Sequence, residues 1–286
     1  MVLPEFDLAK GEHLYLLLDG GQIPELERKL FEVTDSPAYQ PIYLYAPWDA
    51  LREASPCLVE ASSPALLDWY AHGEEGWGYL LSSRLPLLPL AERLRQLIEV
   101  ESPYGSCILL KMAQPDGMFR LLIDDEPWLW QAIEQVWIPV HKLLRPNSPA
   151  EWWNKKVSTS ERPVGKLLRL SDVQWTRLGE VTWLNTLNDI WRHMEKWFPE
   201  RLGEQFDARQ WVAEWAEWGY GKGFESPRDL LFFFNVLGYL GTAWKESDAY
   251  PAITALLMCT SSLTPSQRIE QAAELAETQH RMGTEI

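Results

Sequence analysis

The first residues that could do chemistry lie where an apolar run, two glycines and a helix start follow one another, in LYLLLDGGQIPELERKL (residues 14–30). Such a junction can bind phosphate, because free backbone N–H groups and the helix dipole attract an anion. Neither GxGxxG nor GxxxxGK is present here. Asp19 precedes Gly20 and Gly21, and acidic residues from Glu25 onward fill the first helical turn, where they already complement the dipole. We predict a tight turn with positive φ at the glycines.

The other polar groups with catalytic potential are isolated. Asp189 and His193 are four residues apart on one helix face, but no second histidine joins them, so an ordinary side-chain contact is expected. The acidic run 124–126 precedes Pro127 and is expected to form the acidic N-terminus of the next helix. Ser106 lies at a strand start without GxSxG. The residues therefore predict no catalytic site, no cofactor and no metal.

The cysteines give no sign of a disulfide framework or a metal site. Cys57, Cys107 and Cys259 are far apart, odd in number, and each lies in an apolar context. We expect three buried, inert thiols in a reducing cytosol.

The charge balance restricts the class of partner. The chain has 26 basic and 41 acidic residues, a formal net charge of −15 and a pI near 4.8. Because such a chain repels phosphate backbones and anionic lipids, we expect no nucleic-acid partner. The N-terminus lacks a signal-peptide pattern. The longest apolar run, 230–244, is shorter than the roughly 20 residues of a membrane span, so we expect a core helix and no direct membrane insertion.

Tryptophan is unusually frequent, with 16 residues, and most of them fit helical stripes that indicate core packing. Stacking on sugars or bases is the functional alternative. Trp152 and Trp153 differ from these core-packing tryptophans. Adjacent residues point to different sides of a helix or strand, and this pair lies in a basic island over 142–177. Exposed tryptophan beside cations is a common interface anchor. A solvated connector is the alternative interpretation. The candidate partner-binding residues are Trp152, Trp153, Lys155, Lys156, Arg162, Lys166 and Arg169.

The elements that would position these residues fall into two lobes. Strands are expected at 14–18, 41–46, 56–61, 76–83 and 105–112. Helices are expected at 24–32, 48–52, 63–73, 87–99, 118–123 and 128–141. Five short strands interleaved with helices predict an α/β lobe over residues 1–144.

The character of the sequence changes over residues 145–170, where proline, serine and charge rise and periodicity fails. We expect a basic Pro/Ser/Trp connector there. Residues 171–286 predict an all-α lobe, with Asp207, Ser226 and Thr264 as helix N-caps and Gln267 completing a capping box.

The order of four segments is informative: LYLLLDGGQIPELERKL, YQPIYLYAPWDALREASPCLVEA, GWGYLLSSRLPLLPLAERLRQLIEV and SCILLKMAQPDGMFRLL. Together they resemble the adaptor (chaperone) domain of type VI secretion effectors, the Tap/Tec adaptor family. PCLV (56–59) matches the family's "pyLv" segment, and Leu-Arg (94–95) matches its leucine helix. The chain departs at Gln-Pro-Asp (114–116), where the family has Asp-Pro-Arg, so the pairing of those two charges is lost. The resemblance covers about residues 12–125, and 225–241 is similar to a glycine-ended helix of the second lobe.

This resemblance implies a non-enzymatic adaptor in the cytoplasm of a Gram-negative bacterium. Such a protein binds a cognate toxic effector and helps load it onto the VgrG spike, so the implied partners are that effector and VgrG. Two alternatives remain open. The tryptophans would suit a glycan-binding or glycan-active enzyme, and the acidity would suit an immunity protein that neutralises a basic toxin.

Overall fold

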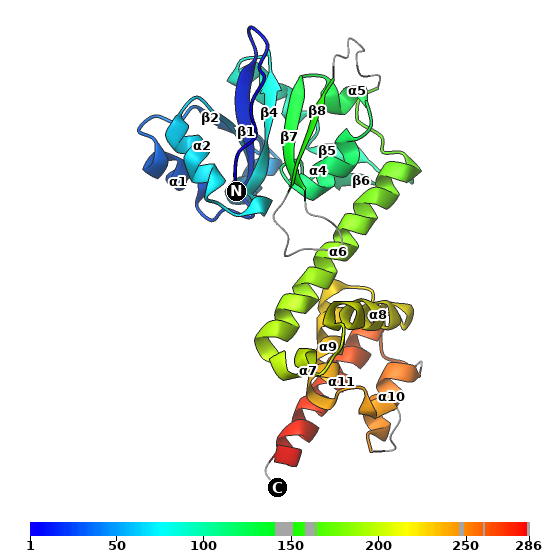
Figure 1. Ribbon diagram of the computed structural model, residues 1–286. Helices are drawn as coiled ribbons and strands as arrows, with labels where there is room; N and C mark the ends of the chain where they lie inside the picture. The colour runs from blue at the N-terminus through cyan, green and yellow to red at the C-terminus, as the bar shows by residue number, and fades with distance from the viewer. Residues whose placement is uncertain (141–150, 158–162, 164, 246–248, 260, 285–286) are drawn as a thin grey trace. The chain divides into compact units, whose positions relative to one another are not determined.

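The computed structural model describes residues 1–140, 151–157, 163, 165–245, 249–259 and 261–284 (Figure 1). The chain forms two compact units, Met1–Val181 and Thr182–Ile286. The first unit contains a mostly antiparallel sheet with interleaved helices, and the described part of the second is helical. The predicted fold class is therefore confirmed. The division lies after the segment 145–170 in which the sequence placed the connector.

A six-stranded sheet forms the centre of the first unit, and each neighbouring pair of strands is antiparallel. Within the described residues its order is β2-β3-β1-β4-β7-β8. The strands are β1 (His13–Asp19), β2 (Tyr39–Pro41), β3 (Pro56–Glu60), β4 (Gly78–Ser83), β7 (Gln135–Val140) and β8 (Glu151–Lys156). β1 lies inside the sheet, and its continuous apolar run is typical of a strand covered on both faces.

The remaining elements of the first unit surround this sheet. A separate two-stranded sheet consists of β5 (Glu99–Glu101) and β6 (Cys107–Leu109). The helices are α1 (Leu26–Val33), η1 (Trp48–Ala54), α2 (Pro64–Ala71), η2 (Glu75–Trp77), α3 (Leu87–Arg95), α4 (Pro115–Leu122) and α5 (Pro127–Trp130). Proline begins α2, α4 and α5, where its missing N–H group breaks no helical hydrogen bond.

Three sequence-based assignments in this unit are wrong. The segment 128–141, expected to be one helix, contains the end of α5 and then β7, because a short apolar run does not distinguish a buried strand from a buried helix. The segment 151–156, expected to lie in an aperiodic connector, is the edge strand β8. The expected strand at 41–46 is replaced by β2, which ends at Pro41. The first unit therefore has more strands than the five expected.

The turn after β1 is tight, as predicted, but for a different reason. A Cβ atom on Gly20 would lie 2.4 Å from the carbonyl oxygen of Ser55. The Asp19 carboxylate accepts a hydrogen bond from the backbone N–H of Gly21 at 2.9 Å. The predicted positive φ at the glycines is wrong, and the left-handed residue of this stretch is Glu25, with φ 55°. Glycine is required here by the close approach of two backbones.

β4 also begins where two backbones approach closely. Gly78 has φ 145°, and a Cβ atom on it would lie 2.1 Å from the carbonyl oxygen of Leu17. A Cβ atom on nearby Gly76 would have no neighbour within 4 Å. A side chain is therefore excluded at Gly78 but not at Gly76.

Apolar clusters cover both faces of the six-stranded sheet, because alternate residues of a strand point to opposite sides. The first-face cluster is built around Tyr15, Leu17, Leu58, Tyr79, Leu81 and Val136 and includes Leu90 and Leu94 of α3. The second-face cluster is built around Leu16, Leu18, Val59, Leu80 and Trp137 and includes Leu26 and Leu30 of α1 and Leu66 and Tyr70 of α2. Burying each large apolar side chain contributes about 1.5–3 kcal/mol.

The second unit is a set of helices. They are α6 (Asp172–Trp197), which begins in the first unit, α7 (Pro199–Gly203), α8 (Ala208–Gly221), α9 (Pro227–Leu240), η3 (Ala243–Lys245), α10 (Pro251–Met258) and α11 (Pro265–Thr284). α9 carries most of the apolar run 230–244 as a core helix, as predicted. No helix in the described part of the chain combines the length and apolar character of a membrane span.

The predicted helix N-caps of this unit are confirmed. Asp207 accepts a hydrogen bond from the third residue after it, and Ser226 does the same. At α11 the capping box is complete. The N–H of Gln267 donates to Oγ1 of Thr264 at 3.2 Å, and the N–H of Thr264 donates to Oε1 of Gln267 at 3.0 Å.

An aromatic cluster fills the core of the second unit, formed by Trp215, Trp218, Phe233 and Trp244. Trp218 stacks on Phe233 with ring centroids 5.3 Å apart, and Trp244 meets Trp218 edge-to-face at 5.6 Å. Lys245 lies over Trp218 at 5.7 Å from the ring centroid. For these tryptophans the predicted core packing is confirmed.

Candidate interaction surface

The two tryptophans of β8 lie on opposite faces of the sheet, as their adjacency predicts. Trp153 packs against the first-face cluster and meets Phe119 of α4 edge-to-face, with centroids 5.1 Å apart. Trp152 packs against the second-face cluster, and its Nε1 donates to the carbonyl oxygen of Val2 at 2.7 Å. Both side chains are half-buried. Each can therefore offer a partner only part of its ring.

The third candidate on this strand, Lys155, is engaged within the first unit. Its Nζ donates to the carbonyl oxygens of Leu122 at 3.1 Å and Ile123 at 2.5 Å, where α4 ends. It also pairs with Asp125 at 2.6 Å and lies 5.4 Å from the ring centroid of Trp130. A cation is favoured at a helix C-terminus by the helix dipole. Lys155 thus joins β8 to α4.

The remaining basic candidates, between residues 156 and 169, differ in how much the structure shows of their side chains. Lys156 and Lys166 are exposed. Arg169 is also exposed, and its Nη2 donates to the carbonyl oxygen of Pro103 at 2.9 Å. Arg162 lies outside the described residues. Partner binding by the seven candidates stays a prediction.

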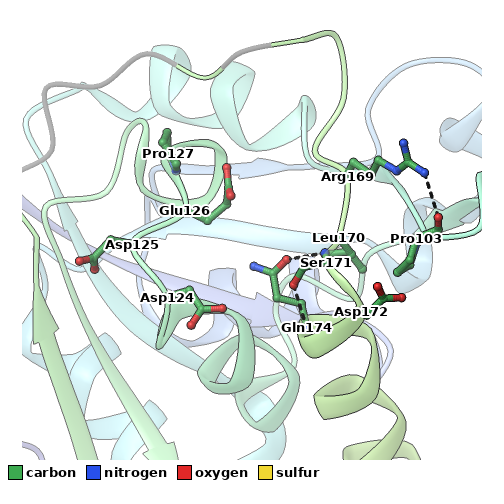
Figure 2. Close-up of a pocket in the computed structure, with 10 residues that line it drawn as sticks. All are labelled: Pro103, Asp124, Asp125, Glu126, Pro127, Arg169, Leu170, Ser171, Asp172 and Gln174. Carbon is green, nitrogen blue, oxygen red and sulfur yellow. Dashed lines mark hydrogen bonds between the residues drawn. The ribbon is translucent and has the colours of Figure 1, made fainter.

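An open hollow of about 660 Å³ lies beside Arg169 in the first unit (Figure 2). The acidic run Asp124–Glu126 and the segment Arg169–Asp172 line it, together with Pro103, Pro127 and Gln174. The sequence did not reveal this hollow, because its two walls are more than 40 residues apart along the chain. The predicted role of the acidic run as a helix start holds for Glu126, whose side chain accepts from the N–H of Trp128 at 3.3 Å.

The carboxylates around the hollow favour a cation over a phosphate, but most of them already form ion pairs or hydrogen bonds within the first unit. Asp124 accepts two hydrogen bonds at 3.0 Å from Nη1 of Arg177 in α6, and Asp125 pairs with Lys155. At the start of α6, the N–H of Ser171 donates to Oε1 of Gln174 at 2.9 Å. These contacts fix the first turns of α6 to the first unit. The hollow is an acidic surface feature with most of its carboxylates engaged.

The other groups with catalytic potential are engaged as well. Asp19 accepts from Gly21, and burial raises the pKa of the Asp19 carboxyl. The turn therefore does not present that N–H group to a phosphate. Nε2 of His193 lies 2.6 Å from Oδ1 of Asn235 in α9, so the partner of this histidine is Asn235 and not Asp189. No group of three or more His, Cys, Asp or Glu residues in the described part of the chain is arranged to hold a metal.

The cysteines differ from the expectation of three buried thiols. Cys57 is buried in the second-face cluster, whereas Cys107 and Cys259 are exposed. The expectation is wrong for these two because an apolar sequence context does not fix which face of an element is covered. The pKa of the Cys107 thiol is raised, by desolvation first and then by the Glu99 carboxylate. A raised pKa keeps the thiol protonated, which makes it a poor nucleophile.

Comparison with known proteins gives one family and one full-length relative. Residues 14–132 match the family described as "Domain of unknown function (DUF4123)". The chain is 40% identical over 296 aligned residues to "Accessory protein VasW" of Vibrio cholerae serotype O1, and the match covers 100% of this chain and 95% of that protein. No solved structure matches the chain.

Proposed function

This chain belongs to the DUF4123 family, the Tap/Tec adaptor family of type VI secretion that its sequence resembles, and from this premise we propose that it is a non-enzymatic adaptor. It acts as an accessory protein of type VI secretion in the cytoplasm. It binds a cognate toxic effector and helps load that effector onto the VgrG spike. The observation that carries the proposal is the identity to an accessory protein over the whole length, which includes both units.

The geometry of the polar residues supports a binding role. The side chains that could have formed a catalytic centre are each used to hold the fold: Asp19 closes the turn after β1, Asp125 pairs with Lys155, and His193 contacts Asn235. A protein that holds another protein needs a large complementary surface, with a few well-packed anchors at its centre. The half-buried tryptophans of β8 are suitable anchors, since each has a fixed ring and one accessible side.

The test is co-purification from the native bacterium in mild salt, followed by identification of the bound proteins. We expect an effector, encoded near this chain, and VgrG. Deletion of the gene should stop secretion of that effector while other type VI secretion continues. Recovery of neither protein, or continued secretion of every effector after deletion, would refute the adaptor role.

Co-expression separates the adaptor from the immunity alternative. An immunity protein rescues cells from the toxin without any secretion apparatus, whereas an adaptor is needed for export. The glycan alternative relied on the number of tryptophans, and Trp215, Trp218 and Trp244 are packed on one another in the second unit. Titration of the purified protein with a panel of polysaccharides, followed by tryptophan fluorescence, would revive that alternative if any of them quenched the signal.

A further inference from the structure

Residues 1–8, the N-terminal strap, lie over the six-stranded sheet without forming a strand or helix of their own (Figure 1). Leu3, Phe6 and Leu8 are half-buried and pack against the second-face cluster. Glu5 and Asp7 are exposed. The strap therefore places apolar side chains on the sheet and carboxylates in solvent.

The strap is fixed mainly at its first residues. The α-amino group of Met1 donates to the carbonyl oxygen of Ala71 in α2, and the carbonyl oxygen of Val2 accepts from Nε1 of Trp152 in β8. Just beyond the strap, the N–H of Ala9 donates to the side chain of Glu12 at 3.3 Å. Between these points, the backbone of residues 3–8 makes no hydrogen bond with any other described residue. Apolar contact alone holds the middle of the strap.

The surface below the strap contains an unused hydrogen-bond donor. Trp137 is fully buried in the second-face cluster, and Phe6 meets its ring edge-to-face with centroids 5.3 Å apart. Nε1 of Trp137 has no hydrogen-bond acceptor within the described part of the chain. A buried donor without a partner costs about 1–3 kcal/mol.

We propose that the surface below the strap, formed by the second-face cluster, Trp137 and Trp152, is a binding groove for an extended segment of the effector, and that the strap is a built-in occupant which this segment displaces. The inference rests on the proposed function. The strap itself shows the pattern that fits: apolar residues at the positions of Leu3, Phe6 and Leu8. Competition with the strap lowers the apparent affinity of the free adaptor, since only the open fraction can bind.

Charge complementarity specifies the segment further. The chain as a whole carries a formal net charge of −15, and Glu5 and Asp7 of the strap belong to this acidic excess. A segment of the same apolar pattern with Lys or Arg at these two exposed positions would be attracted by the net negative charge of the chain, which disfavours the carboxylates of the strap. The occupant is therefore an extended apolar segment with basic residues between its apolar ones, and its advantage should fall as salt screens the charges.

The groove can be tested without the effector, by using synthetic peptides on the full-length Phe6→Ala protein. The probes are the peptide of residues 1–10 and the same peptide carrying Glu5→Lys and Asp7→Lys; the control peptide carries Phe6→Ala. We expect the lysine peptide to bind roughly ten-fold more tightly than the natural one at low salt, and the control peptide not to bind. Equal binding of the two charged forms, or no binding of either, would overturn the proposed groove chemistry.

The displacement itself is tested with the effector recovered by co-purification. Phe6→Ala and Leu3→Ala each remove an apolar contact of the strap with the second-face cluster. Val2→Ala is the matched control, because the Val2 side chain is 89% exposed and its carbonyl group is unchanged. We expect about ten-fold tighter effector binding for the two release variants and no change for the control. Effector binding should also increase acylation of the Met1 amino group, measured by mass spectrometry.

The outcomes separate this inference from the proposed function. If the effector binds all four proteins equally and leaves Met1 reactivity unchanged, the strap is a fixed part of the fold and the inference fails, while the adaptor role stands. If no folded variant and no wild-type protein binds any effector, the adaptor role fails and the displacement with it. If the release variants form dimers, the groove takes a second copy of this chain and the proposal is wrong.

Discussion

The two units bury their large aromatic side chains by different means. In the first unit the buried tyrosines use their hydroxyl groups: Tyr15 donates to the carbonyl oxygen of Leu85 at 2.8 Å, and Tyr70 donates to that of Gly78 at 2.8 Å. In the second unit the rings pack on one another, and cations such as Lys245 lie over their faces. The first unit therefore adds tyrosine hydroxyl bonds and close backbone contact to its ring packing, whereas the core of the second unit relies mainly on rings packed on one another.

This difference can be tested by changes that should each loosen only one unit. Hydrogen exchange followed by mass spectrometry is the suitable measurement, because it reports the stability of residues 1–181 and of residues 182–284 separately. A change that loosened both units equally would show that they do not differ in this way.

The largest effect is expected from Phe233→Ala in the second unit. Phe233 is fully buried and contacts Trp218, Trp215 and Phe224. Truncation leaves a cavity in the aromatic cluster and should lower the free energy of unfolding of this unit by about 3–5 kcal/mol. The matched control is Phe206→Ala, since Phe206 is fully exposed and its loss should cost less than about 0.5 kcal/mol. Similar values for the two variants would contradict the ring-packing account.

In the first unit, Gly78→Ala is expected to cost about 2–3 kcal/mol. The new Cβ atom would meet the Leu17 carbonyl oxygen, and φ 145° is strained for alanine. Gly76→Ala, two residues earlier, meets no neighbour and should be nearly neutral. Exchange should rise in β1 and β4 and stay unchanged in the second unit. Protection of β1 at the wild-type level in Gly78→Ala would show that the backbones can separate at no cost.

Alkaline pH should loosen the first unit before the second. Burial raises the pKa of Tyr15 and of Tyr43 to about 12. Because the folded state holds these protons more tightly than the unfolded chain, their contribution is complete below about pH 10 and is lost as the pH rises toward 12. Limited proteolysis between pH 8 and 11.5 should cleave residues 1–181 first. Phenylalanine at both positions should reduce the pH dependence, and an unchanged profile would place its cause elsewhere.

The smallest effect is expected at the start of α11. Thr264→Ala removes one side of the capping box and should cost the second unit about 1 kcal/mol. Gln271→Ala, on the exposed surface of the same helix, is the control and should change stability by less than about 0.5 kcal/mol. Thermal unfolding, compared for the two variants, resolves this difference; equal midpoints would mean that the cap contributes nothing.

The sequence predicts best those elements that local chemistry determines. β1 has an apolar run followed by glycine, and α11 has both members of its capping box, so each was found within a few residues. β7 was missed because QVWIPV is apolar after Gln135, without alternation, and contains Pro139, which argues against a strand inside a sheet. β8 was missed because EWWNKK has no apolar alternation. Its pairing with β7 is a long-range property that local patterns do not encode.

The candidate surface shows the same division between local and distant information. That Trp152 and Trp153 point to opposite sides follows from their adjacency alone. Their partners do not: Val2 and Phe119 lie far away in the sequence. The sequence does not distinguish Lys155 from a solvent-facing cation, because the carbonyl groups at the end of α4 that it contacts are more than 30 residues away in the chain.

The position of β1 has a consequence for synthesis of the chain. β1 leaves the ribosome before the other strands and then pairs with β3 on one side and β4 on the other, so later strands can add to an existing edge. Until β7 is translated, β4 offers Leu80 and Leu81 along an open edge. Unpaired apolar edges recruit other chains. Between translation of residue 83 and residue 140, the nascent polypeptide therefore exposes an apolar edge that is open to aggregation.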